Sequence, residues 1–210
     1  MSAAKKERIS STRPGAFHLL GPGGLPAKEF AAWYRKESLR RWESLDLTNI
    51  AKLAEKIVKV EKERREIFVM GNGGSASTAS HWATDLSKTA YVSRRPMIRC
   101  RSLSENIAYL TAIGNDISFD DCFSRQLENI LNPGDLVILI SGSGNSKNLI
   151  KACQLAKEKK AQTVGILGFD GGRLKTMVDL AITVPSSQYG VIEDMHMAIG
   201  HILTFYLKQR

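Results

Sequence analysis

The chain has 210 residues, of which 43% are hydrophobic and 24% charged, and its formal net charge is +9. This length predicts one domain with a substantial core, and the composition is typical of ordinary soluble globular proteins. No apolar run approaches the roughly 20 residues that cross a bilayer, so we expect no membrane partner. No secretory signal is expected either, because no apolar stretch follows the basic N-terminus. Three cysteines without CxxC spacing predict reduced thiols in a cytoplasmic protein.

The positive charge is concentrated near the N-terminus. Residues 1–41 hold nine basic and three acidic side chains, and the difference of six accounts for most of the net charge. A second basic cluster comprises Arg94, Arg95, Arg99 and Arg101. No helix-turn-helix, zinc-finger or RNA-binding signature accompanies this charge. Nucleic-acid binding is therefore the less favoured interpretation, and solvated faces with an anion-attracting field are the more favoured one.

The N-terminal part of the chain predicts a flexible arm followed by two helices. Residues 1–26 are interrupted by glycine, proline and serine, and we expect them to form a flexible basic arm. One helix is expected over about 27–44, and Asp46 or Thr48 could cap the next. The apolar positions of the two helices are Phe30, Trp33, Tyr34, Trp42, Ile50, Leu53, Ala54, Ile57 and Val58. The pattern leaves open whether the aromatic residues contact a partner or are buried within the monomer.

From Ile67 onward, predicted strands and helices alternate. Strands are expected over 67–70, 97–101, 136–140, 163–167 and 180–184, and helices over about 75–90, 104–113, 119–131, 146–159, 171–177 and 188–208. Alternation with short turns predicts a parallel sheet covered by helices on both faces. We therefore expect a single α/β domain over residues 27–210.

Two glycine- and serine-rich turns each join a predicted strand to a predicted helix. The first is Gly71-Asn72-Gly73-Gly74-Ser75, and the second is Ser141-Gly142-Ser143-Gly144-Asn145-Ser146. Unpaired backbone N–H groups and the helix dipole make such a turn an anion site. An ordinary helix cap would need only one serine, so the three serines of the second turn favour a phosphate. Two such turns in one parallel sheet predict a site for a phosphorylated small molecule.

Together with His81, Asp85 and Gly114-Asn115-Asp116, these turns resemble the sugar-isomerase (SIS) fold, and more closely its phosphoheptose isomerase (sedoheptulose-7-phosphate isomerase) branch. The resemblance covers about residues 27–210. It implies a three-layer fold with a five-stranded parallel sheet, two N-terminal helices used in oligomerisation, and a homotetramer. The substrate-binding residues that it implies are Asn72, Gly73, Gly74, Ser75, Asn115, Asp116, Ser141, Gly142, Ser143 and Ser146.

The same resemblance implies a metal site. His81 and Asp85 are four residues apart and share a helix face, and Glu193 and His201, eight apart, nearly share one. The matching family positions are His, Glu, Gln and His, and they bind zinc. Two imidazoles and two carboxylates suit one Zn²⁺ per active site. The alternative is a capped or core histidine beside solvated acids. His196 turns away from this face, and we expect it to pack in the core.

The implied reaction is aldose–ketose isomerisation of a phosphosugar, most simply of sedoheptulose 7-phosphate to a heptose 7-phosphate for surface polysaccharide. A base removes the proton beside the carbonyl and an acid returns it to the neighbouring carbon. His201 and Asp85 are the first choices for these roles, and Glu193 is the third. Compared with the family, Asp85 is one methylene shorter than the usual Glu, and Glu193 replaces Gln.

Two other classes of function remain open. One is a non-catalytic SIS protein that binds a partner protein, as replication-initiator-binding members do, and the other is a phosphosugar sensor without chemistry. The four ligand-type residues favour the enzyme, because a scaffold has no need of them. The basic arm and the tryptophans favour the partner-binding protein.

Overall fold

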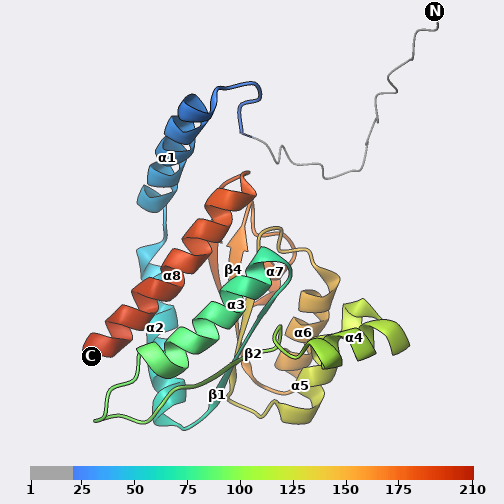
Figure 1. Ribbon diagram of the computed structural model, residues 1–210. Coiled ribbons are helices and arrows are strands. Elements are labelled where there is room, and N and C mark those ends of the chain that lie inside the picture. Colours follow the sequence, from blue (N-terminus) through green and yellow to red (C-terminus); the bar gives the residue numbers. More distant parts are fainter. Residues whose placement is uncertain (1–20) are drawn as a thin grey trace, which may run out of the picture.

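A computed structural model describes residues 21–210, so most of the predicted basic arm lies outside the described residues. The chain forms a five-stranded, wholly parallel sheet in the order β2-β1-β3-β4-β5, as Figure 1 shows. The strands are β1 (Glu66–Gly71), β2 (Arg99–Ser102), β3 (Leu136–Ser141), β4 (Gln162–Gly168) and β5 (Leu180–Val184). The predicted fold class is therefore confirmed, and all five strands lie within two residues of their expected positions.

Helices connect the strands and cover both faces of the sheet. They are α1 (Ala27–Glu43), α2 (Leu47–Lys62), α3 (Gly74–Thr84), α4 (Ile107–Asp116), α5 (Ser124–Ile130), α6 (Lys147–Glu158), α7 (Leu174–Met177) and α8 (Tyr189–Gln209). A π-helical turn over Asp85–Thr89 continues α3, and a 3₁₀ turn over Phe119–Asp121 precedes α5. No helix in the described part of the chain combines the length and the apolar character that crossing a membrane requires.

The alternating side chains of the buried strands supply two separate hydrophobic cores. On β1, Ile67 and Val69 point to the core shared with α2, α3 and α8, whereas Phe68 and Met70 point to the core shared with α4 to α7. Both faces are buried, which explains why these strands are nearly continuous apolar runs in the sequence. Helix α2 differs from the expected stripe at one position, because Val60 is fully buried and Val58 only partly so.

Helices α3 and α8 pack closely and run in parallel (Figure 1). Trp82 of α3 is fully buried, and its Nε1 donates a hydrogen bond to the His196 carbonyl oxygen of α8 at 3.2 Å. A Cβ on Gly200 would overlap the Trp82 indole, so this glycine sets the separation of the two helices. His196 is fully buried as expected, and burial lowers the pKa of its imidazole to about 4.

Helix α1 extends away from the body and has no buried residue. A hydrogen bond from the Tyr34 hydroxyl to Asp194 Oδ2 of α8, at 2.7 Å, ties it to the body. Burial and the Asp194 carboxylate raise the pKa of Tyr34 above its usual range, so the phenol stays protonated.

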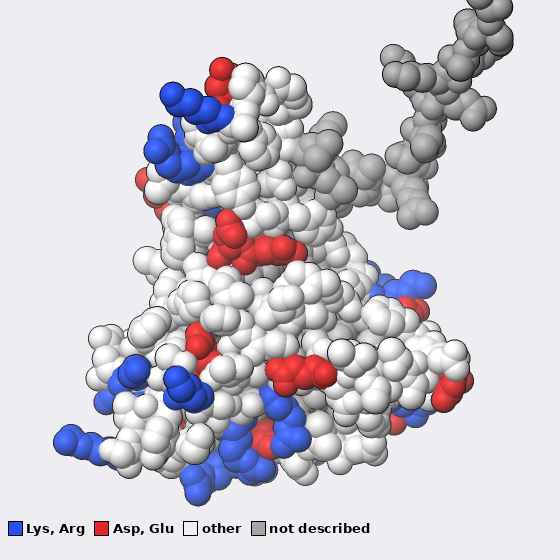
Figure 2. Space-filling model, in the orientation of Figure 1, with Lys and Arg blue, Asp and Glu red and all other residues white. Residues whose placement is uncertain are grey.

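The basic cluster near β2 lies away from the glycine and serine turns. Basic side chains gather at the lower edge of the molecule in Figure 2, where β1 and β2 begin, and the turns follow the other ends of β1 and β3. Arg99 and Arg101 both pair with Glu66, at 3.0 and 2.6 Å, and Arg95 pairs with Glu61 at 3.3 Å. Glu61 also pairs with Arg210, so these two carboxylates offset only part of the positive charge.

Candidate active site

The second turn, here called the serine loop (residues 141–146), connects β3 to α6 at the carboxyl end of the sheet. Its backbone bends sharply at Gly144, where φ is +64° and a Cβ would overlap the Gly171 carbonyl. Only glycine meets both conditions comfortably. The loop is held against the turn after β4 by hydrogen bonds from Gly168 N to the Gly142 carbonyl oxygen and from Leu174 N to the Gly144 carbonyl oxygen, both at 3.0 Å.

The three serine hydroxyls of the loop keep a proton available for a ligand. Ser141 Oγ accepts a hydrogen bond from Gly144 N at 3.0 Å, and Ser143 Oγ accepts one from Asn145 N at 3.2 Å. A hydroxyl that accepts in this way can still donate its own hydrogen. Ser146 occupies the N-cap position of α6, yet its side chain makes no capping hydrogen bond. This arrangement matches phosphate binding better than ordinary capping.

A pocket of about 180 Å³ opens over the serine loop. Its lining residues are Asn72, Ser75, Ile140, Ser141, Gly142, Ser143, Ser146, Tyr189 and Glu193. The pocket thus brings together residues of both predicted turns, as the sequence led us to expect. The Tyr189 ring lies so close to Gly142 that a Cβ there would be 2.6 Å from its Cε1, and its edge meets the Phe169 ring at a centroid distance of 5.0 Å.

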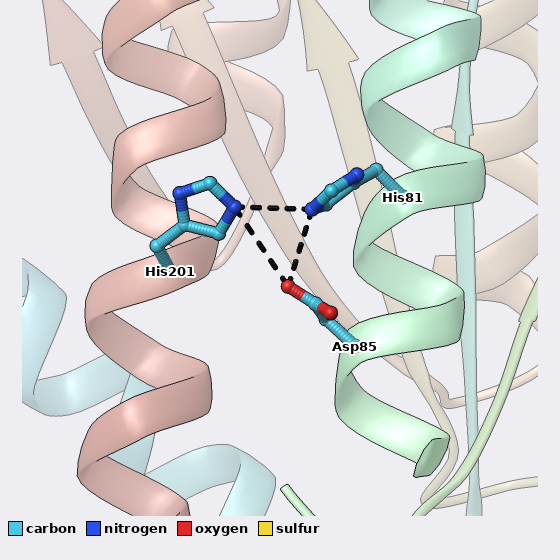
Figure 3. A group of neighbouring side chains, drawn as sticks. All are labelled: His81, Asp85 and His201. Carbon is cyan, nitrogen blue, oxygen red and sulfur yellow. Dashed lines mark hydrogen bonds and ion pairs between the residues drawn. The ribbon is translucent and has the colours of Figure 1, made fainter. Parts of the chain in front are cut away.

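A second group of candidate site residues lies between α3 and α8 (Figure 3). His81 Nε2 is 3.0 Å from His201 Nε2 and 3.2 Å from Asp85 Oδ2, and the third separation, from His201 Nε2 to Asp85 Oδ2, is 3.8 Å. Asp85 is held from the other side by Thr89, whose hydroxyl donates to Oδ1 at 2.9 Å within the π-helical turn. One carboxylate oxygen therefore faces the two imidazoles while the other is anchored.

The three ligand atoms fit a zinc ion. Zinc lies about 2.0–2.2 Å from imidazole nitrogen and carboxylate oxygen, so ligand atoms at the corners of a tetrahedron are about 3.3 Å apart. The observed separations of 3.0, 3.2 and 3.8 Å bracket that value. Two imidazoles and one carboxylate leave a fourth position free, as in catalytic zinc sites. Both histidine side chains are nearly half exposed, so a substrate could reach that position.

Glu193 lies apart from this group. The ligand-type group among the described residues comprises His81, Asp85 and His201, whereas Glu193 lines the serine-loop pocket and its carboxylate lies against Gly74. Glu193 and His201 are eight residues apart, which corresponds to a rise of about 12 Å along the helix. The prediction that they bind one ion considered only the helix face that they share. Burial and the neighbouring Asp194 charge raise the pKa of Glu193.

Asn115 and Asp116 are also separate from the pocket. They form the exposed end of α4, where Asn115 Nδ2 donates to Asp116 Oδ1 at 2.8 Å, and neither lines the serine-loop pocket of its own chain. Conversely, the sequence did not indicate Tyr189 or the anchoring role of Thr89. No spacing rule marks Tyr189, whereas Thr89 is four residues after Asp85, a helical spacing that could have indicated their contact.

Comparison with known proteins agrees with this fold. The family model described as SIS domain matches residues 33–168. A phosphoheptose isomerase of Trichlorobacter lovleyi is 39% identical over 160 residues, covering 76% of this chain and 81% of the relative. The phosphoheptose isomerase of Nitratiruptor is 44% identical over 146 residues, covering 70% and 78% of the two chains.

Solved structures give the same result. The structure of phosphoheptose isomerase from Neisseria gonorrhoeae superimposes with a TM-score of 0.82 at 29% identity, and it covers 88% of this chain and 100% of its own. A phosphoheptose isomerase from Francisella tularensis has a TM-score of 0.80 at 26% identity, covering 87% and 96%. A five-stranded parallel sheet flanked by helices, together with the match to the SIS domain, places the chain in the class of SIS-domain proteins. Within that class, the chain belongs to the phosphoheptose isomerase family of SIS-domain proteins.

Proposed function

We propose that this protein is an aldose–ketose isomerase that converts sedoheptulose 7-phosphate to a heptose 7-phosphate for surface polysaccharide synthesis. The proposal is carried by one observation. A chain of the phosphoheptose isomerase family has a serine-loop pocket at one end of the α3–α8 pair and a His81–Asp85–His201 group further along the same pair. A sugar phosphate needs both a phosphate site and a separate place for proton transfer.

In this proposal the serine loop binds the phosphate. The hydroxyls of Ser141, Ser143 and Ser146 and the backbone N–H groups at the start of α6 donate to its oxygens. The first turn, over Asn72, Gly73, Gly74 and Ser75, contacts the sugar from the start of α3. Asn115 and Asp116 remain predicted sugar-binding residues by resemblance, although they do not line this pocket.

Proton transfer is assigned to His201 and Asp85, which face each other across α3 and α8. One group removes the proton from the carbon beside the carbonyl, and the other returns a proton to the neighbouring carbon. Glu193 is the third group available, and it is the one of the three that a zinc ion on His81, Asp85 and His201 would leave free for proton transfer. Its raised pKa allows it to retain a proton closer to neutral pH than an exposed glutamate would.

His81, Asp85 and His201 are the residues that would hold a zinc ion, one per active site. A zinc ion bound there would supply Lewis-acid polarisation of the substrate carbonyl oxygen. The sequence predicted Glu193 as a fourth zinc ligand. In this proposal Glu193 lines the serine-loop pocket instead. We further propose that the protein is a homotetramer in the cytoplasm, with α1 and α2 at subunit contacts and without a nucleic-acid partner.

An isomerisation assay with sedoheptulose 7-phosphate tests the proposal. We expect turnover that a chelator abolishes and added Zn²⁺ restores, with about one ion per chain by metal analysis. His201→Ala should lower kcat/KM by more than the roughly 10²–10⁴-fold typical of losing a general base, because a metal ligand is lost as well. Lys208→Ala, at an exposed position of the same helix, is the control. Protein that binds the sugar phosphate but never converts it would disprove catalysis.

A further inference from the structure

Asn148 is a buried polar residue that connects the two predicted turns. It is the second residue of α6, two positions after the serine loop, and only 2% of it is exposed. It does not itself line the serine-loop pocket. Its side chain reaches Asn72, a pocket residue of the first turn.

The hydrogen bonds of the Asn148 amide are complete. Its Oδ1 accepts from Asn72 Nδ2 at 3.0 Å and from the backbone N–H of Leu149 at 2.9 Å. Its Nδ2 donates to Asn72 Oδ1 at 2.9 Å and to Cys122 Sγ at 3.4 Å. An asparagine side chain offers two donors and two lone pairs, and all four are used here. Buried polar networks of this kind hold one arrangement, because any other leaves a buried group unpaired.

This network also determines which way the Asn72 amide points. The Leu149 N–H can only donate, so the Asn148 atom beside it must be the oxygen. The Asn72 atom facing that oxygen must then be the nitrogen, and the Asn72 oxygen faces Asn148 Nδ2. Asn72 retains one N–H and one carbonyl lone pair, and it lines the pocket. A backbone group of α6 thus sets the orientation of a donor in the sugar-binding turn.

We propose that Asn148 is a positioning residue that fixes the side-chain orientation of Asn72 for the sugar part of the substrate. The serine loop binds the phosphate part of the substrate, and neither Asn148 nor Asn72 belongs to that loop. Asn148 also connects the start of α6 to the start of α3, so it keeps the sugar-binding turn in register with the phosphate site. The identity of the sugar rests on the proposed function, but the orientation of Asn72 does not.

The experiment compares two variants of Asn148 with a matched control. Asn148→Leu keeps the size and removes all four hydrogen bonds. Asn148→Ser leaves a hydroxyl near the Leu149 N–H but is too short for Asn72, and it serves if the leucine variant fails to fold. Cys122→Ala is the control, because it removes a weak partner of Asn148 and leaves the Asn72 pair intact.

Binding is measured by calorimetry with two probes, inorganic phosphate and sedoheptulose 7-phosphate. We expect either Asn148 variant to weaken sugar-phosphate binding by roughly tenfold and to leave phosphate binding within about twofold. In an Asn72→Ala background the same change should add less than about twofold, because the residue acts through Asn72. Equal loss for both probes, or additive losses, would show a merely structural role and overturn the proposal.

An NMR measurement on the ligand-free protein tests the orientation of Asn72 independently of the proposed function. The side-chain NH₂ signals of Asn72, assigned by their disappearance in Asn72→Ala, are followed in ¹⁵N-labelled protein. We expect them to shift and to exchange faster with water in Asn148→Ser, and to stay unchanged in Cys122→Ala. Unchanged Asn72 signals in the Asn148 variants would overturn the proposal even if the enzyme is active, and changed signals would support it even if the sugar is a different one.

Discussion

At the scale of single residues, substitution of Ser146 should affect phosphate binding without affecting the stability of α6. It occupies the N-cap position of α6 without capping it, so Ser146→Ala should leave the free energy of unfolding nearly unchanged. Loss of a hydroxyl that donates to a charged phosphate should cost roughly 1.5–3 kcal/mol of binding, or about tenfold or more in affinity. Calorimetry with a sugar phosphate measures the affinity, and thermal unfolding measures the stability.

Ser118→Ala is the opposite control for Ser146. The Ser118 hydroxyl accepts a hydrogen bond from Asp120 N at 3.1 Å and caps the 3₁₀ turn. Its loss should lower the melting temperature without weakening phosphate binding. If Ser146→Ala instead lowered stability and left affinity unchanged, Ser146 would be an ordinary cap and the role assigned to it would be wrong.

His196 makes the folded protein sensitive to acid. Its pKa is about 4 in the folded chain and near 6.5 when unfolded, so the unfolded chain binds more protons between these values. The free energy of unfolding should therefore fall as the pH decreases from about 6.5 to about 4, by up to about 3 kcal/mol. His196→Leu should remove this part of the pH dependence, measured by chemical denaturation at fixed protein concentration. Equal slopes for the two proteins would contradict the prediction.

At the scale of elements, the strands were predictable because each is an apolar run between breakers. The helix boundaries were less predictable than the strands, because they depend on individual side chains. Asn106 accepts a hydrogen bond from Tyr109 N at 3.0 Å, which delays α4 to Ile107. The short α7 begins only at Leu174, because Gly171 and Gly172 both adopt positive φ. Asparagine and glycine both mark possible helix ends in a sequence, but only the folded chain shows which candidate is used.

The sequence predicted most of the residues that form the candidate site. It did not predict that they lie in two separate groups, the serine-loop pocket and the His81–Asp85–His201 group. Each turn follows a strand, so its position at the carboxyl end of the sheet follows from the topology. His81, Asp85 and His201 come together as the family resemblance implied. Glu193 does not join them, because eight residues separate it from His201, which is a rise of about 12 Å along the helix axis. The parallel packing of α3 and α8 decides which residues meet.

Gly200→Ala tests the packing of α3 against α8. A Cβ at this position would overlap the Trp82 indole, which is fully buried. We expect the two helices to separate, stability to fall by about 1–3 kcal/mol, and zinc affinity to fall because His81 and His201 move apart. Gly114→Ala in α4 is the control, since its Cβ would meet nothing closer than 3.9 Å and a helical alanine is favoured. Unchanged stability in Gly200→Ala would show that the close approach is unimportant.

At the scale of the whole molecule, the apolar surface is larger than a monomer needs. Helix α1 has 17 residues and none is buried, and isolated helices of this length are marginal in water. The exposed side chains include Leu39 at 58%, Trp42 at 40%, Phe205 at 58% and Tyr206 at 46%. Aromatic residues of this kind are enriched at interfaces between proteins. Other copies of the chain would cover them and give α1 the packing that it lacks.

The family resemblance implies a tetramer, so we expect sedimentation at micromolar concentration to give four times the chain mass of 23.2 kDa, and no monodisperse monomer. Leu39→Lys with Trp42→Lys should shift the protein to smaller species, because charges placed on this face must be desolvated when subunits meet. Lys52→Glu, at an exposed position of α2, should leave the assembly unchanged if α2 contributes only its apolar residues. A monodisperse monomer of the unmodified chain would disprove the assembly, and α1 would then have to be stabilised by its own sequence and by its contacts with α8, which include the Tyr34–Asp194 hydrogen bond.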